Sequence, residues 1–335
     1  MIVVDPTYLP DDNMRGEYLL SDVGVVYQGW NGKRWIYGQF VEVVLDAVMM
    51  LMEQSGLSEA DRGDIVKVSR MISWLVNAND GKGVVAGRWQ EPYDDGRKPW
   101  EWSSSVQILK QYYETRQAVA YGQCWVFASV STTVARTLGI PSRPVTNIGS
   151  AHDTDDSLTI DKFLDKDMNE IERSGDSTWN FHVWTETWFS RSDINSVYSG
   201  WQVIDATPQE RSDGLMQAGP GSVIAVQRGD VQHHYDLHFI WSEVSSLTVV
   251  WTPDPKVPLG WRKAKMTTQE TGIAVLTKAI GKVNGYSADD AEKITFQYKH
   301  ADENERRDAL ANVSSLITCS RLDIIINNNL PFHPL

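Results

Sequence analysis

The most constraining feature of this chain is an apolar helical stripe that begins just after a cysteine. An apolar residue stands at every fourth position from Val126 to Leu138, and Gly139 follows as a stop signal. This spacing predicts a buried helix whose first residue is Cys124. Unpaired backbone N–H groups and the positive end of the helix dipole favour a thiolate at that position. The pattern predicts either a nucleophilic thiol or a small buried side chain, which is the common fate of a free cysteine.

Two segments rich in aromatic and β-branched residues carry possible partners for such a thiol. Residues 179–189 contain neither Gly nor Pro and are typical of a strand, and this strand carries His182. Residues 200–208 form a second short strand, which carries Asp205 and ends at a proline. A thiol nucleophile needs a base that takes its proton and a third group that orients the base. The histidine and the aspartate can fill these roles, although a lone strand histidine is often structural and an aspartate at a strand end often forms a turn.

Composition limits the classes of protein to which the chain can belong. Its 335 residues are 41% hydrophobic and carry a net charge of −13, so it can bury a large core and is a poor partner for nucleic acid. Its two cysteines, Cys124 and Cys319, give no disulfide framework. The apolar run at 41–52 is too short for a membrane span and predicts a buried helix. No basic segment followed by an apolar stretch opens the chain, so we expect a cytoplasmic protein, with unconventional export left open.

Helix signals are concentrated in the first half of the chain and strand signals in the second. Helices are expected at 39–54, 58–62, 63–77, 105–115, 124–138 and, with many charges, 303–316. A loop rich in Gly, Asp and Trp spans 78–102, and a strand-rich region follows Asp205 up to residue 298. This order predicts an α+β layered fold.

Three segments, 122–128, 179–184 and 200–210, resemble the three catalytic blocks of the animal transglutaminases. They stand in the family's order and at matching separations, and the resemblance extends from residue 18 to residue 310. It implies a papain-like cysteine-hydrolase fold, in which the nucleophile helix packs on an antiparallel sheet.

The resemblance also implies a division of the chain into three parts. These are an N-terminal segment at 1–17, a catalytic core at 18–318 and a divergent tail at 319–335. The β-sandwich and β-barrels that flank the core in animal members have no counterpart in this sequence, which we expect to be a truncated or minimal form.

Individual residues receive roles from the same resemblance. Cys124 is the nucleophile, His182 transfers protons and Asp205 orients His182. Trp89 resembles the tryptophan whose indole N–H helps to bind the oxyanion, and Trp179 resembles a wall of the tunnel through which the amine arrives. Aromatic walls exclude water, which would otherwise hydrolyse the acyl-enzyme.

The activity that the resemblance implies is that of a protein-glutamine gamma-glutamyltransferase. Such an enzyme joins glutamine side chains of one protein to lysine side chains or polyamines through a cysteine thioester. Two alternatives use the same residues. A cysteine protease or amidase would place the triad in an open cleft, and a non-catalytic scaffold would keep the fold without turnover.

Calcium is the cofactor that the resemblance implies. The loop at 153–159 has oxygen-bearing side chains at alternate positions, which suits a hard cation, although such acidic patterns are often only solvated turns. The loop matches a family calcium site completed by an acid just before the histidine block. The expected ligands are Asp153, Asp155, Ser157, the Thr159 carbonyl and Asp176.

Two further clusters match family calcium sites only in part. The first cluster comprises Asn77, Asn79 and Asp80, and the second comprises Asp302 and Glu305. Where the second site has an Asn-x-Asp segment in the family, this chain has Leu247 in place of the carboxylate. Because carboxylates supply both ligand atoms and charge, this loss is expected to weaken the second site and to alter the calcium dependence.

Overall fold

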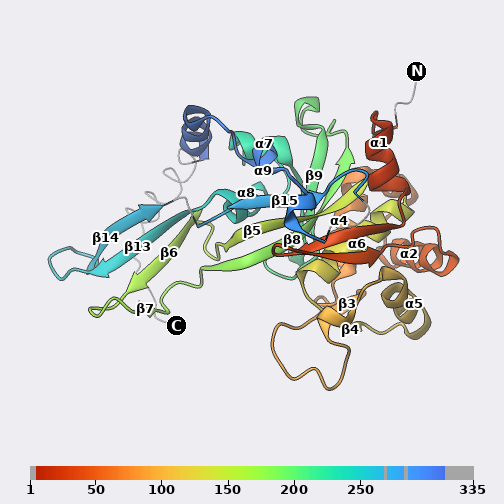
Figure 1. Ribbon diagram of the computed structural model, residues 1–335, viewed down its shortest axis with the longest axis horizontal. Coiled ribbons are helices and arrows are strands. Elements are labelled where there is room, and N and C mark those ends of the chain that lie inside the picture. Colours follow the sequence, from red (N-terminus) through yellow and green to blue (C-terminus); the bar gives the residue numbers. More distant parts are fainter. Residues whose placement is uncertain (1–4, 268–269, 283–285, 314–335) are drawn as a thin grey trace.

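The centre of the molecule is a six-stranded antiparallel sheet (Figure 1). The computed structural model describes residues 5–267, 270–282 and 286–313. From one edge to the other, the strands are β12 (Ala218–Ser222), β9 (Gly200–Asp205), β8 (Ser177–Phe189), β5 (Ser142–His152), β15 (Ala274–Lys278) and β16 (Ala291–Lys293). The predicted α+β fold with an antiparallel sheet is confirmed.

Helices cover both faces of this sheet. One layer contains α2 (Glu42–Gln54), α4 (Ile65–Val76), α5 (Ser105–Thr115) and α6 (Cys124–Thr137). The other contains α7 (Val223–Arg228), α8 (Leu237–Ser245) and α9 (Thr295–Tyr298). Successive strand residues point to opposite faces, so Val183 and Ile204 pack with the first layer while Trp184 and Val203 pack with the second. The sheet is therefore buried between two hydrophobic cores.

Helix α6 lies within the first layer and is buried along nearly its whole length. Every residue from 124 to 136 is buried, which explains the apolar and small side chains on all its sides. Beyond its end, Gly139 adopts φ +82°, a left-handed conformation that favours glycine. The Arg136 side chain donates two hydrogen bonds to the Ser142 carbonyl, at 3.0 and 2.8 Å, and so fixes the start of β5. The helix thus holds Cys124 at the end of a rigid, fully packed element.

The helices expected in the first half of the chain are confirmed within a few residues. The remaining helical segments are α1 (Asp12–Arg15), α3 (Glu59–Arg62), a π-helical turn (Gly16–Leu20), 3-10 turns (Pro99–Glu101, Ser196–Tyr198, Ala288–Asp290) and residues 303–313. Helix α2 is only partly buried, because Leu45 and Met49 point outward. In the part of the chain that the structure describes, no helix has the length and apolar character needed to cross a membrane.

The region after Asp205 is rich in strands as expected, but it also contains the helices α7 and α8, which the sequence did not predict. In α8, Leu237, Ile240, Trp241 and Val244 are buried in the second core at helical spacing. Short helices of this kind pack their apolar faces against the sheet. This difference matters for the site, because α8 lies beside β5 and contributes a carboxyl group to the interior.

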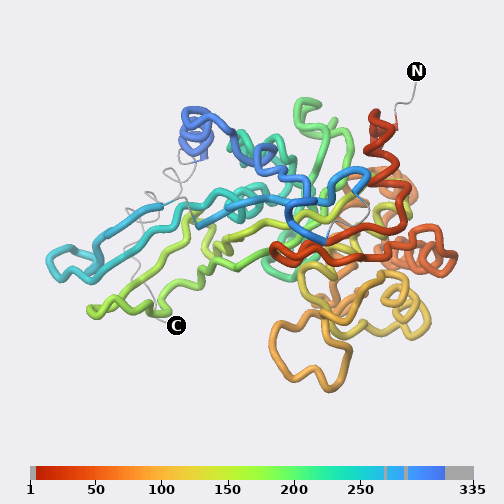
Figure 2. Tube along the Cα trace, viewed as in Figure 1, coloured from red at the N-terminus to blue at the C-terminus, as the bar shows by residue number. Residues whose placement is uncertain are grey.

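A second sheet, which we call the arm, projects from one end of the molecule (Figures 1 and 2). Its strands, in order, are β14 (Trp261–Thr267), β13 (Leu247–Pro253), β6 (Thr159–Leu164) and β7 (Glu170–Ile171). Strands β6 and β13 are parallel, and Leu247 pairs with Thr159 at the base. The arm therefore begins on one side just after α8 and on the other side just after the predicted calcium loop.

Three two-stranded sheets complete the fold. They pair β1 (Val23–Gln28) with β2 (Asn31–Ile36), β3 (Val85–Gly87) with β4 (Val119–Gly122), and β10 (Arg211–Ser212) with β11 (Leu215–Met216). Strand β4 leads into α6, and the Arg88 N–H donates to the Gly122 carbonyl at 3.1 Å. A Cβ on Gly122 would lie 2.4 Å from a Val85 methyl carbon, so glycine permits this close pairing. The pairing brings the segment with Trp89 to the start of α6.

Candidate active site

Neighbouring strands bring His182 and Asp205 into direct contact. The His182 Nε2 donates a hydrogen bond of 2.6 Å to the Asp205 Oδ2, and both side chains are buried. The other carboxylate oxygen, Oδ1, accepts the Thr207 N–H at 2.8 Å. Because the carboxylate is held at both oxygens, it fixes the orientation of the ring. The structure thus brings together two of the three residues of the predicted triad by a short hydrogen bond.

Cys124 approaches the same imidazole from the start of α6. Its thiol is close enough to His182 to act on the pKa of the ring through a hydrogen bond. Nε2 is occupied by Asp205, and among the described residues Nδ1 has no other hydrogen-bond partner. Nδ1 is therefore the nitrogen available to the thiol. The thiol, the imidazole and the carboxylate thus lie in the order needed for proton transfer, with the hydrogen bond between His182 and Asp205 already formed.

The environment of His182 favours its protonated form. Burial by itself would lower the pKa of the ring, because a charge is poorly solvated in the interior. The Asp205 carboxylate, with its negative charge and its hydrogen bond, together with Cys124 and Glu243, raises the pKa well above its usual value. A histidine with this pKa can hold a proton beside a thiolate and return it to a leaving group.

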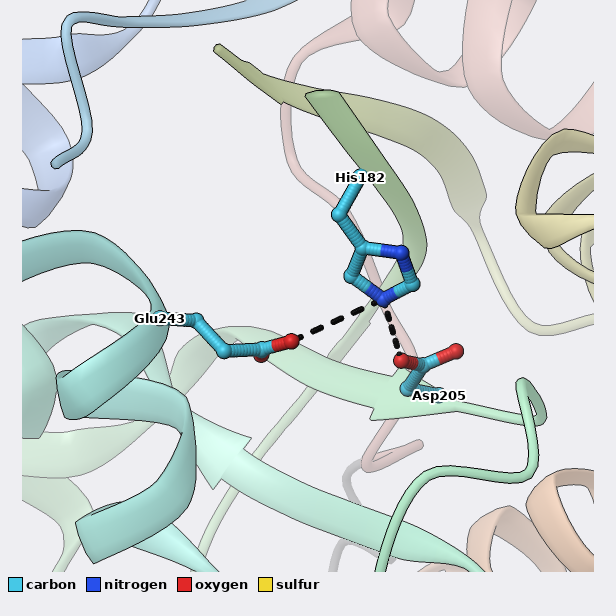
Figure 3. Close-up of side chains that lie close together, drawn as sticks. All are labelled: His182, Asp205 and Glu243. Carbon is cyan, nitrogen blue, oxygen red and sulfur yellow. Dashed lines mark hydrogen bonds and ion pairs between the residues drawn. The ribbon is translucent and has the colours of Figure 1, made fainter. Parts of the chain in front are cut away.

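Two residues that the sequence did not single out, Gln209 and Glu243, lie beside the His182–Asp205 pair. The Gln209 Nε2 donates to the Asp205 Oδ2 at 2.9 Å and to the Glu243 Oε1 at 3.1 Å. The Glu243 Oε1 lies 3.6 Å from the His182 Nε2, and Figure 3 shows that it approaches from α8 while Asp205 approaches from β9. Gln209 stands four residues after Asp205 in one of the resembling blocks. Glu243 lies in α8, where the sequence predicted no helix.

Aromatic rings surround the thiol and the imidazole. The Trp89 ring stacks on Phe127, one turn into α6, with centroids 6.3 Å apart, and 43% of its surface is exposed. The Trp179 ring meets His182 edge to face at 5.2 Å. It also contacts His152 at 5.7 Å. Trp179 therefore lies beside the predicted base, and Trp89 lies against the first turn of the helix that Cys124 begins.

The predicted calcium loop gathers three carboxylates at its base. One oxygen each from Asp153, Asp155 and Asp176 lies within 4.8 Å of the others, a spacing that suits a shared cation. Asp153 is buried, and burial raises the pKa of its carboxyl to about 7. Its Oδ2 also accepts a hydrogen bond from the Ser242 hydroxyl of α8 at 3.2 Å. The donor set fits a hard divalent cation, which would neutralise this concentration of negative charge.

The two other predicted loop ligands lie in the same loop. The Ser157 hydroxyl donates to the Thr159 carbonyl at 3.2 Å and contacts the Thr159 hydroxyl at 3.0 Å. The carboxylates of Asp153 and Asp176 also accept backbone N–H groups of the loop and of β6. The loop is therefore ordered by its own hydrogen bonds.

The predicted calcium cluster of Asn77, Asn79 and Asp80 is engaged in protein contacts. The Asn77 amide donates to the Met216 carbonyl at 2.7 Å, and its oxygen accepts the Asn79 N–H at 3.0 Å. Asp80 accepts the Met216 N–H at 2.8 Å and pairs with Arg211 at 3.4 Å. These contacts fix the end of α4, and in the described residues no group of three acidic, His or Cys ligands forms there.

The predicted cluster of Asp302 and Glu305 lies at the surface. Asp302 accepts the N–H groups of Asn304 and Glu305, at 2.8 and 3.1 Å, as the N-terminal cap of the helix at 303–313. The Glu305 carboxylate lies 3.1 Å from the His300 Nδ1. Leu247 starts β13 of the arm. Over the described residues, the two acids form no three-ligand group. Cys319 lies outside the described residues.

Comparison with known proteins shows which family shares the segment that contains these residues. Residues 85–206, which contain Cys124, His182 and Asp205, match the transglutaminase-like superfamily core. The chain belongs to the transglutaminase family. This core includes the nucleophile helix and strands β5, β8 and β9 of the central sheet.

Similar transglutaminases extend this match to most of the length of the chain. The hemocyte protein-glutamine gamma-glutamyltransferase of Tachypleus tridentatus is 49% identical, over 92% of this chain and 42% of the relative. The human protein-glutamine gamma-glutamyltransferase 4 is 40% identical, over 95% of this chain and 46% of the relative. The crystal structure of red sea bream transglutaminase superposes with a TM-score of 0.81 at 38% identity, over 92% of this chain and 48% of that one. The chain therefore spans less than half the length of these relatives.

Proposed function

We propose that the chain is a protein-glutamine gamma-glutamyltransferase, with Cys124, His182 and Asp205 as its catalytic residues. The observation that carries this proposal is the buried hydrogen bond between His182 and Asp205, together with the Cys124 thiol close to the same imidazole. The relatives named above are gamma-glutamyltransferases, which favours acyl transfer over simple hydrolysis. We assign this activity to residues 18–318, with 1–17 and 319–335 outside the catalytic core.

The first half of the reaction forms a thioester. The Cys124 thiolate attacks the carboxamide carbon of a glutamine side chain while His182 holds the proton that came from the thiol. As the tetrahedral intermediate collapses, the C–N bond breaks and His182 Nδ1 gives its proton to the departing ammonia. Asp205 keeps the other ring proton on Nε2 throughout, so Nδ1 always faces the reacting atoms.

The second half of the reaction forms the isopeptide bond. A lysine ε-amine or a polyamine attacks the thioester carbonyl, and His182 takes a proton from the attacking nitrogen. The C–S bond then breaks and the thiolate is restored beside the protonated ring. Water could attack the same thioester, so the tryptophan rings of Trp89 and Trp179 have the role of shielding it.

Stabilisation of the oxyanion comes from donors near the thiol. We assign this role to the Trp89 indole N–H and the Cys124 backbone N–H, which is one of the unpaired donors at the start of α6. Trp179 is assigned to the wall of the amine tunnel, since its ring edge meets His182.

Calcium has a structural role in this proposal. Asp153, Asp155 and Asp176 would hold the ion, with Ser157 and the Thr159 carbonyl as further oxygen donors. The cation would neutralise three carboxylates and so hold the loop against β6 and α8. The partial matches at Asn77, Asn79 and Asp80 and at Asp302 and Glu305 are weaker candidates, because their oxygens are engaged in contacts within the protein.

Incorporation of a labelled primary amine into casein, with and without calcium, tests the proposal. A transglutaminase attaches the label and releases ammonia, and the reaction requires Cys124. A protease or amidase releases peptides or ammonia without attaching the label. A scaffold gives neither product. Release of ammonia without label would therefore refute acyl transfer while preserving the role of the thiol.

A further inference from the structure

Glu243 is a fully buried carboxyl group that the triad does not account for. Its side chain is 1% exposed, and Oε1 lies 3.6 Å from the His182 Nε2. Burying a carboxyl group without an adjacent arginine or lysine is costly, so such a group usually has a defined task. The charged groups near Glu243 are the catalytic imidazole and the Asp205 carboxylate, and burial, helped by that carboxylate, raises the pKa of Glu243 to about 8.

Gln209 connects Glu243 to the Asp205–His182 pair. Its amide nitrogen has two protons, and these are donated to Asp205 and Glu243. Gln209 Nε2 also lies 3.1 Å from His182 Nε2, and both nitrogens are donors toward the same Asp205 oxygen. The two carboxyl groups and the ring nitrogen therefore converge on one amide group. This arrangement fixes the position of Glu243 relative to the ring.

We propose that Glu243 is a positioning residue for His182, a second carboxyl group that acts with Gln209 to keep the imidazole protonated at alkaline pH. The proposal rests on the function proposed above for its link to turnover, because a protonated His182 supplies the proton to the departing ammonia. The effect of the Glu243 carboxyl group on the His182 ring does not depend on that function.

The pH range of the effect follows from the groups that face Glu243. These are His182 from β8, Asp205 from β9, Gln209 from the loop after β9, and the Asn147 amide of β5, which donates to the Glu243 main-chain carbonyl at 2.8 Å. Below about pH 8 the neutral carboxyl group exerts no charge on the ring. Above that pH an ionised carboxylate 3.6 Å away favours the imidazolium. Glu243 therefore affects the alkaline limb of a pH profile and leaves the acid limb unchanged.

NMR titration of the histidine side chains measures this effect directly. The background is Cys124→Ala, so that no thiol titrates beside the ring, and His182 is assigned by the signal that is lost in His182→Asn. Glu243→Gln should lower the pKa of His182 by at least about one pH unit. In enzyme with an intact thiol, the same substitution should move the alkaline limb of kcat/KM toward acid, with little change in KM. An unchanged pKa of His182 would overturn the proposal.

Glu210→Gln is the matched control. Glu210 follows Gln209 in the chain, but its carboxylate binds the His152 Nε2 at 2.9 Å. Its substitution should leave the pKa of His182 unchanged, and an equal shift would show that any nearby charge has this effect, which overturns the specific role of Glu243. Glu243→Asp keeps the carboxylate, so the pKa of His182 should lie between its values in Glu243→Gln and in the protein with Glu243 intact.

If the Glu243→Gln variant does not fold, a second measurement on protein with Glu243 intact tests the same proposal. In the Cys124→Ala background with Glu243 intact, the His182 signal should show a second inflection near pH 8, where Glu243 ionises. A single inflection would refute the proposal. Because the titration needs no turnover, a shift in the pKa together with no amine incorporation would refute the proposed function and leave the role of Glu243 intact.

Discussion

Replacing Asp205 by asparagine should reverse the tautomer of the catalytic imidazole. The Thr207 N–H donates to Oδ1, whereas His182 and Gln209 donate to Oδ2. Both carboxylate oxygens accept, but asparagine has only one acceptor oxygen. With that oxygen toward Thr207, its NH₂ group points at His182 and donates to Nε2, and the ring proton moves to Nδ1. The nitrogen that faces Cys124 can then no longer accept the thiol proton.

The opposite orientation of the asparagine is no better. It places the NH₂ group against the Thr207 N–H and leaves two buried donors facing each other, which costs about 1–3 kcal/mol. In the first orientation the new NH₂ group also faces Gln209, but the Gln209 amide can turn so that its oxygen accepts, whereas the Thr207 backbone N–H cannot turn. The first orientation should therefore dominate. A wrong tautomer in a catalytic triad costs about 10⁴-fold in kcat. We expect a loss of about 10³- to 10⁴-fold for Asp205→Asn, which corresponds to about 4–5.5 kcal/mol in the activation barrier at 1.36 kcal/mol per decade.

Steady-state amine incorporation, with the concentration of the glutamine substrate varied, measures this loss. The loss should lie in kcat, with KM changed less than about threefold, because Asp205 acts on the ring and not on the substrate. Asp193→Asn is the control, since Asp193 binds the buried Arg191 by two hydrogen bonds of 2.9 Å, away from the site. A kcat for Asp205→Asn within about tenfold of wild type, or a loss confined to KM, would refute the tautomer argument.

Four further results are expected. Cys124→Ala should abolish amine incorporation and keep the melting temperature, and residual crosslinking would exclude the proposed nucleophile. Asp155→Ala should remove most of the calcium-induced rise in melting temperature seen by calorimetry, and an unchanged rise would reduce the loop to a solvated turn. Glu186→Gln leaves Arg143 buried without its carboxylate, and urea unfolding should show a loss of about 3–5 kcal/mol; a loss under about 1 kcal/mol would contradict this. The pKa of Glu243 rises from 4.5 to about 8 on folding, so its contribution to stability is complete below pH 4.5 and is lost as the pH rises through 8. The free energy of unfolding should therefore change less between these pH values in Glu243→Gln than in wild type. An equal change in both proteins would refute the raised pKa of Glu243.

Local patterns were sufficient to predict the parts of the molecule that carry the triad. The apolar period after Cys124 predicted α6, and the β-branched runs predicted the strands of His182 and Asp205. Each of these elements is long or strongly patterned and packs in a large core, so its sequence shows which face is buried. The acidic loop could be predicted for the same reason, since Asp153 and Asp155 are neighbours in the chain.

Contacts between distant segments could not be predicted in this way. Glu243 reaches His182 only because α8 packs against the sheet, and no local pattern encodes that approach. The helical spacing of Leu237 and Val244 was present in the sequence, but α8 is short and follows a region of mixed character. The parallel pairing of β6 with β13 joins Thr159 to Leu247, and this register depends on the whole fold. Sequence patterns therefore identify a helix or a strand more readily than they identify the distant segments that it contacts.

The arm has a mechanical consequence for the site. Its two parallel strands leave the body together, one beginning beside the acidic loop and the other just beyond α8. Within α8, Ser242 hydrogen bonds to that loop and the next residue, Glu243, faces the imidazole. A pull applied at the tip of the arm, for example through a tether in an optical trap, loads both strands in the same direction. Through these two strands the tension reaches the acidic loop and α8, and through β7, which precedes β8 in the chain, it reaches the strand of His182, so force offers a way to disturb the imidazole without changing any residue around it.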